Sequence, residues 1–294
     1  MLGAIVAAGL LQGGIYALIS LGLTLMFGVL RVVNFAHGDF LMVAMYLTWL
    51  VTSRLGWDPL AASLITVPLF LLAGALLYEL VIRRTFSAAA PLLAQVFATV
   101  GLSIVLQNLA LLLAGADVHE TSSHWVSGSM VLGSLRLESM KVVMLAAMLV
   151  LGGGLSLFLY RTRLGRQMRA VAQNPAAAIL MGIDVRRVYG WTFAISCAAV
   201  GLAGTLLATT MLSHPTVGLQ FGMVCFMTVV IGGLGSIRGA ILGGFLIGVT
   251  EAMTSFYLNP IVSQAFVYVI FLAVLLLRPA GLFGQDGYLE ARAE

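Results

Sequence analysis

Long apolar stretches alternate with short polar ones along the whole chain. A stretch of about 20 apolar residues is enough for one membrane-spanning helix, whereas a membrane β-barrel would show alternating segments of about ten residues. The pattern therefore predicts an all-α, polytopic helical membrane protein with eight or nine transmembrane spans, some of them short, broken or re-entrant glycine-rich segments. The apolar stretches cover residues 3–30, 38–53, 59–82, 91–115, 141–160, 189–212, 221–237, 239–257 and 261–277.

The composition agrees with a membrane protein. Of the 294 residues, 61% are hydrophobic and only 9% are charged, whereas a soluble domain carries about 25% charged residues. No long polar region divides the chain, so we expect one transmembrane domain over residues 1–294. The net charge of +4 reflects arginines that cluster between the spans, which indicates membrane orientation and not binding to nucleic acid.

The arginines predict which loops face the cytoplasm. The loop around residues 161–188 holds six arginines and one acid, Asp184. Because cytoplasmic loops carry an excess of Arg and Lys, we expect this loop in the cytoplasm. The loop around residues 115–140 has no such excess, so we expect it outside. Counting spans places the N-terminus outside and, with nine spans, the C-terminus inside.

The segment RVVNFAHGD, residues 31–39, places four polar or charged side chains between the first two apolar stretches. One interpretation is a polar turn at the membrane surface. The other is a segment inside the protein, because the first stretch is longer than one span needs and irregular backbone at membrane depth is tolerated where it lines a cavity. We expect Asn34 and His37 inside, hydrogen-bonded to neighbouring spans near a substrate path, with Gly38 and Asp39 as further path residues.

Three more polar residues interrupt apolar stretches, namely Gln107, Asn108 and Glu251. A polar group inside a membrane is costly and often functional, so we take these three as further candidates for the substrate path. For Glu251, the interfacial end of a span is an equally good interpretation.

The sequence predicts no metal site and no cofactor. His119 and His124 lie in the outer loop with acids nearby, but their spacing suits a metal poorly. The only lysine, Lys141, is not part of a Gly-Lys-Ser/Thr phosphate loop. We therefore expect that the chain is not an enzyme and that any ATP is hydrolysed by another subunit.

Glycines recur at a spacing of four in the glycine-rich run 231–248, at Gly235, Gly239 and Gly243. Small residues at this spacing allow close approach of membrane helices, which lack a hydrophobic driving force between them. We interpret these glycines as helix-packing residues.

The arginine-rich loop contains a short helix. Asn174 and Pro175 are a typical helix start, and Gly182 is a typical end. Its apolar side, with Leu180 and Met181, must be buried somewhere, either on the membrane surface or in a groove of another protein.

Five blocks in order resemble the permeases of the high-affinity branched-chain amino acid ABC transporter family. Within them, NPAAAILMG resembles the coupling loop that docks on the ATPase subunit, except that Ala176 stands where that loop has glutamate, and Arg238 stands where the family commonly has proline. The resemblance implies a coupling role for Pro175, Ala176, Ala177, Ala178, Leu180, Met181 and Gly182. The blocks are residues 13–40, 78–84 with 101–108, 162–183, 231–252 and 275–284.

The resemblance implies a multi-pass protein of the bacterial inner membrane that works with other subunits. These would be a second permease, homologous or identical, two ATP-binding subunits at the cytoplasmic face and a periplasmic substrate-binding protein. The substrate would be leucine, isoleucine or valine, although the family includes permeases for urea and short-chain amides. A secondary transporter driven by an ion gradient is the alternative class, because Glu251, Asp39 and His37 could carry protons or sodium.

Overall fold

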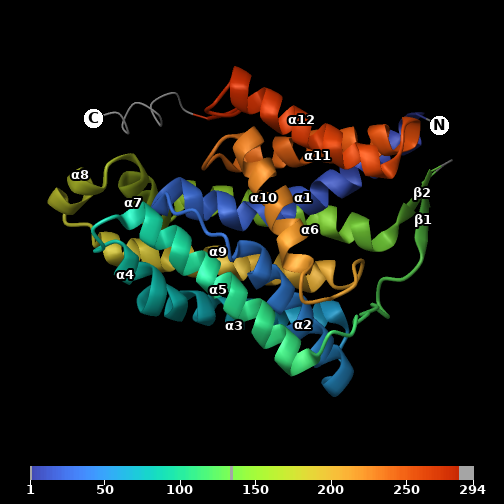
Figure 1. Cartoon of the computed structure of the whole chain (residues 1–294), viewed down its shortest axis with the longest axis horizontal. Helices are drawn as coiled ribbons and strands as arrows, with labels where there is room; N and C mark the ends of the chain where they lie inside the picture. Colours follow the sequence, from blue (N-terminus) through green and yellow to red (C-terminus); the bar gives the residue numbers. More distant parts are fainter. Residues whose placement is uncertain (1, 133–134, 285–294) are drawn as a thin grey trace.

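The computed structural model describes residues 2–132 and 135–284 (Figure 1). Within them, nine helices of at least 16 residues follow the nine apolar stretches in order. These are α1 (Leu2–Leu30), α2 (His37–Leu55), α3 (Pro59–Leu77), α5 (Pro91–Ala114), α6 (Ser139–Arg161), α9 (Val185–Leu207), α10 (Val217–Gly232), α11 (Ile237–Tyr257) and α12 (Pro260–Leu277). The shorter elements are the π-helix η1 (Tyr78–Ile82), α4 (Arg83–Thr85), α7 (Arg163–Gln173), α8 (Pro175–Leu180) and the strands β1 (Ser129–Leu132) and β2 (Leu135–Glu138).

Seven of the nine helices are long and apolar enough to cross a membrane, with α3 continuing through η1 and α4 to Thr85. The other two are α2, which has charged residues in its first and last turns, and α10, which has only 16 residues. The prediction of an all-α, multi-span membrane protein is therefore confirmed, and α2 and α10 are its short or polar-ended segments.

The two ends of the molecule differ in composition. In Figure 1, α7 and α8 lie at one end and the β1–β2 hairpin lies at the other. We call the first the arginine-rich end, because α6 finishes there at Arg161 and α7 contributes Arg163, Arg166 and Arg169. We call the second the hairpin end. The membrane helices run between these two ends.

Helix α1 lies at the centre of the molecule and contacts α6, α9, α10 and α11. Of its 29 residues, 18 are buried. Glycines make the closest contacts: a Cβ on Gly13 would lie 2.7 Å from the Gly244 carbonyl oxygen, and one on Gly9 would lie 2.7 Å from the Val249 Cα. Backbone-to-backbone packing of this kind replaces the hydrophobic force that membrane helices lack.

The predicted packing glycines behave in two ways. Gly239 packs against the backbone of Gly232 in α10, and a Cβ on Gly243 would lie 2.7 Å from a carbonyl oxygen of α10. Both therefore lie where α10 and α11 pack together. Gly235 lies in the turn between α10 and α11 with φ of +83°, a backbone conformation that glycine adopts without strain, and it also lies against α1, since a Cβ on Gly28 would be 2.9 Å from the Gly235 Cα.

The β-hairpin was not predicted. Its strands are antiparallel and pair Ser129 with Glu138 and Val131 with Arg136. The signal in the sequence was the alternation of apolar and charged residues over 135–138, which is typical of a strand with one exposed face.

Candidate functional site

Helix α2 begins beside the middle of α1. Its first residue, His37, is 2% exposed, and the His37 Nε2 lies 3.3 Å from the Ile19 carbonyl oxygen. Ile19 precedes the last residue of α1, Leu30, by eleven residues, which is about 16 Å along a helix axis. Arg31 has a left-handed φ of 56°, which ends α1. Residues 31–36 therefore run from the end of α1 back into the protein.

Helix α10 begins at the same place as α2. Gly38 packs directly on the Gly218 carbonyl group, and a Cβ on Gly218 would lie 2.7 Å from the Gly38 carbonyl oxygen. Each helix N-terminus carries unpaired N–H groups and a partial positive charge. Two such ends meet here inside the protein, and broken helices of this kind form the substrate sites of many transporters. We call this contact the α2–α10 junction.

Asp39 is an acid in the first turn of α2, at this junction, and it is 1% exposed. The Gln107 Nε2 of α5 donates to Asp39 Oδ1 over 2.9 Å and to Ser103 Oγ over 3.1 Å. Asp39 and Gln107 are separate candidates in the sequence, and the structure brings their side chains together.

Helix α5 presents one polar face to this region. Gln95, Thr99 and Ser103 are its buried residues, and Gln107 continues the same spacing of four, which places all four on one face of the helix. The Thr99 hydroxyl lies 3.5 Å from the Val33 carbonyl oxygen, beside the segment that leads into α2. Gln95, Thr99 and Ser103 were not predicted, although polar residues at every fourth position of an apolar stretch are a signal in the sequence.

Asn34 and His37 were expected inside the protein, hydrogen-bonded to neighbouring spans near the path. Both side chains are buried, and the His37 Nε2 lies within hydrogen-bond distance of the Ile19 carbonyl oxygen of α1. The Asn34 Oδ1 accepts a hydrogen bond from the Ala36 backbone N–H over 3.1 Å, within the same segment. The Asn34 Nδ2 is buried and has no partner in the described part of the chain.

Two other predicted path residues lie apart from the junction. Asn108 is exposed and donates to the Ile104 carbonyl oxygen in its own helix, over 2.8 Å. Glu251 accepts a hydrogen bond of 2.6 Å from the Tyr16 hydroxyl, which joins α11 to α1. Among the described residues, neither side chain hydrogen-bonds to the α2–α10 junction, so the structure does not join all the predicted residues in one hydrogen-bonded group.

The short helix α8 at the arginine-rich end begins as predicted. The Asn174 Oδ1 accepts a hydrogen bond from the Ala177 N–H over 3.0 Å, and Pro175 occupies the first turn. Gly182 follows the helix with φ of +76°, which turns the chain toward α9.

One side of α8 faces away from the rest of the chain. Ala178 is buried, whereas Leu180 and Met181 are 88% and 81% exposed. Large apolar side chains that are this exposed, side by side at the tip of a loop, are typical of a contact with another protein or a membrane.

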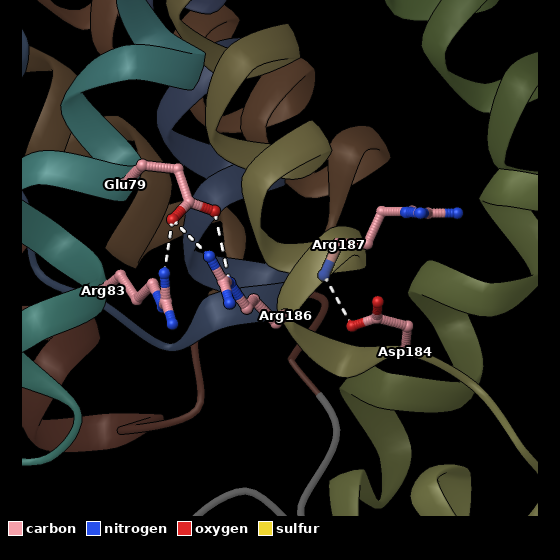
Figure 2. Close-up of polar contacts among 5 residues, drawn as sticks. All are labelled: Glu79, Arg83, Asp184, Arg186 and Arg187. Atoms are coloured by element: carbon pink, nitrogen blue, oxygen red, sulfur yellow. Dashed lines mark hydrogen bonds and ion pairs between the residues drawn. The ribbon is translucent and has the colours of Figure 1, made fainter.

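Glu79, which lies in η1 directly after α3, binds the start of α9, as Figure 2 shows. Its Oε2 accepts from Arg83 Nη1 one turn later and from Arg186 Nη2 at the start of α9, over 2.8 Å each. A second contact from Arg186 Nε reaches Glu79 Oε1 at 3.4 Å. The pair between Glu79 and Arg186 therefore joins the end of α3 to the segment that directly follows α8. Glu79 was not predicted, although the sequence shows it as an isolated acid four residues before an arginine.

Asp58 organises the hairpin end. Partial burial alone would raise the pKa of Asp58, but hydrogen bonds from the N–H groups of Leu60, Trp125 and His124 and from the Ser123 hydroxyl outweigh it and lower this pKa. The bonds to the Asp58 carboxylate are 2.8–3.1 Å for the three N–H groups and 2.9 Å for the hydroxyl. One carboxylate thus caps α3 and holds the outer loop.

A multi-span helical protein with broken helices meeting inside it, and with a short exposed apolar helix at one end, belongs to the class of membrane permeases. Residues 5–275 match the family model described as "Branched-chain amino acid transport system / permease component". The chain belongs to this family, and the predicted resemblance is confirmed.

Several curated proteins are similar over nearly their whole length. The permease protein LivH of a high-affinity branched-chain amino acid transport system in Salmonella typhimurium is 33% identical over 94% of both chains. BraD of Pseudomonas aeruginosa, from a system of the same description, is 31% identical over 94% of both chains. A probable LivH of Methanocaldococcus jannaschii is 29% identical over 96% of this chain and 92% of its own. No solved structure matches.

Family membership fixes the general role of the chain. It is a multi-pass inner-membrane permease of an ABC importer, and it is a transport component. The family implies ATPase and binding-protein partners in general.

Proposed function

We propose that this chain forms part of the membrane path for branched-chain amino acids, and that α8 couples the path to ATP hydrolysis in a partner subunit. The geometry at the arginine-rich end carries this proposal. There, Leu180 and Met181 protrude from α8, and Glu79 links the following segment to the end of α3. A displacement of α8 by the partner subunit would therefore be transmitted to α3 and α9 together.

The orientation follows from the charges. The arginine-rich end faces the cytoplasm, because loops rich in Arg remain on that side. The hairpin end then faces the periplasm, where the loop held by Asp58 meets the binding protein. The complete transporter contains two permease chains, two ATPase subunits and one binding protein. This chain itself catalyses no reaction.

The path runs along the α2–α10 junction. Asn34, His37, Gly38 and Asp39 lie at the start of α2, and the polar face of α5 with Gln107 lies opposite. This arrangement supports the proposal because buried polar groups inside a membrane domain are costly and are retained mainly for function. Asn108 and Glu251 take no part in this path, and Glu251 instead positions α11 on α1 through Tyr16.

The test is uptake of radiolabelled leucine by proteoliposomes that contain this chain, its partner permease, the ATPase subunits and the binding protein. We expect uptake that requires ATP and that unlabelled isoleucine and valine block, whereas urea and acetamide do not. Block by urea or acetamide would move the substrate to the amide-transporting branch of the family. Uptake that ignores ATP and follows a proton or sodium gradient would contradict the coupling role of α8.

A further inference from the structure

A cavity of about 890 Å³ opens at the arginine-rich end, between the ends of α1 and α6, helix α7 and the turn that joins α10 to α11. Four arginines from these segments line it, namely Arg31, Arg161, Arg169 and Arg238. None of the described residues around the cavity is acidic. The coupling role proposed for α8 does not involve this cavity. The positive charge of the cavity favours a ligand that carries at least one negative charge.

Two of the arginines are held in place by the chain. The Arg169 Nε donates to the Leu159 carbonyl oxygen over 3.1 Å, and its guanidinium lies 4.6 Å from the centre of the Tyr160 ring. The Arg31 Nη2 donates to the Ala172 carbonyl oxygen over 3.1 Å. The Arg169 contacts leave further guanidinium N–H groups, since each Arg carries five. The cavity wall is therefore fixed before a ligand binds.

The other two arginines are available for a ligand. Arg161 and Arg238 are exposed, and their side chains make no hydrogen bond or ion pair within residues 2–132 and 135–284. Guanidinium groups match the geometry of phosphate oxygens and can bind them in pairs.

The apolar part of the cavity wall distinguishes between two candidate ligands, a phospholipid and a free anion. Leu25 and Val29 of α1 and Leu157 of α6 line the cavity, and they belong to helices long and apolar enough to span the membrane. Leu157 is 62% exposed, on a face of α6 that would meet hydrocarbon. A free phosphate would need only the arginines, whereas a phospholipid would also use the apolar wall above them.

We propose that this cavity binds the phosphate headgroup of an anionic phospholipid from the leaflet at the arginine-rich end. The four arginines hold the phosphate, and the acyl chains lie along α1 and α6. Basic pockets between membrane helices are a recurrent place for such headgroups. The lipid fills the space between α6–α7 and the α10–α11 turn and so joins two parts of the permease next to the coupling loop.

The experiment is native mass spectrometry of the whole chain after mild delipidation, titrated with phosphatidylglycerol or with phosphatidylcholine of the same acyl chains. We expect phosphatidylglycerol to bind more tightly. The double variant R161Q/R238Q removes the two available arginines and should weaken phosphatidylglycerol binding roughly 10- to 30-fold, given the contribution of each Arg near an anionic lipid. The matched control R84Q/R187Q removes two exposed charges that do not line the cavity, and should change binding less than about twofold.

Three results would overturn the proposal. Equal losses in the double variant and in the control would show diffuse attraction instead of a site. Equal binding of phosphatidylcholine would show that the headgroup charge is not recognised. Stabilisation of the lipid-free chain by millimolar inorganic phosphate, to the same extent as by phosphatidylglycerol, would assign the cavity to a free anion. If the double variant does not purify as folded protein, each single variant is measured instead, with an expected loss of about three- to fivefold.

Discussion

The α2–α10 junction and the α8 loop are both polar interruptions of an apolar chain, but they are built in opposite ways. At the junction, His37 and Asp39 are buried and the helices touch through glycine backbone. At α8, Leu180 and Met181 are exposed, and the ion pairs of Glu79 are open to solvent. A substitution at the junction forces the neighbouring residues to repack. A substitution of the exposed side chains of α8 leaves the packing of the membrane helices unchanged. The two regions should therefore respond differently to substitution.

The largest effect is expected at Gly38. A Cβ there would overlap the Gly218 carbonyl group and approach the Gly222 Cα to 2.9 Å, so Gly38→Val should destabilise the fold by about 1–3 kcal/mol or more. Gly154→Ala is the control, because a Cβ at that position meets nothing within 4 Å and alanine favours a helix by about 0.5–1 kcal/mol over glycine. Thermal unfolding in detergent, followed by size-exclusion chromatography, measures both. Equal melting temperatures for the two variants would show that the junction is not tightly packed.

The second largest effect is expected at α8, where a substitution should lower uptake without lowering the stability of the fold. L180S/M181S removes two exposed apolar side chains, so the melting temperature should stay unchanged. Loss of one buried Leu contact costs about 1.5–3 kcal/mol, so ATP-driven uptake should fall at least about tenfold. Leu180→Met is the conservative control and should retain uptake. Normal uptake by the double variant would show that α8 does not dock on the ATPase.

A smaller effect is expected from the ion pairs of Glu79, which offer a matched comparison. Arg83 and Arg186 both lie 2.8 Å from the Glu79 carboxylate, but only Arg186 comes from another membrane helix. Solvent-exposed ion pairs contribute little to stability, so Arg186→Gln should lower uptake only a few-fold, less than L180S/M181S does, and should leave the melting temperature unchanged. Arg83→Gln should have less effect on uptake. If uptake is equally impaired in the two variants, the ion pair between Glu79 and Arg186 does not transmit the movement of α8 to α3.

The sequence predicts these two regions unequally. Apolar length alone predicts eight or nine spans, because a membrane forces every backbone polar group into helical hydrogen bonds, and the described residues form nine long helices along these stretches. Local signals also predict the start of α8, since Asn174 caps the N–H groups of its own first turn. The meeting of Gly38 with Gly218 could not be predicted, because contacts between residues 180 positions apart depend on how the helices pack. The same holds for the bond between Asp39 and Gln107 and for the pair between Glu79 and Arg186.

The smallest effect is expected at Asp58, a buried carboxylate that is held by hydrogen bonds from the outer loop. Because its pKa is lower in the folded protein than the usual 3.8, its bonds stabilise the outer loop fully above that value. This stabilisation is lost as the pH falls through the lower, folded pKa. Hydrogen-exchange protection of the His124 and Trp125 amides, which donate to Asp58, should therefore be constant from pH 7 down to about 4 and decrease below it. In Asp58→Asn the same amides should be less protected and show no such step, whereas amides at the α2–α10 junction should keep their protection in both proteins. A step of the same size in Asp58→Asn would assign the pH dependence to another group, and a simultaneous loss at the junction would show that the two regions do not open independently.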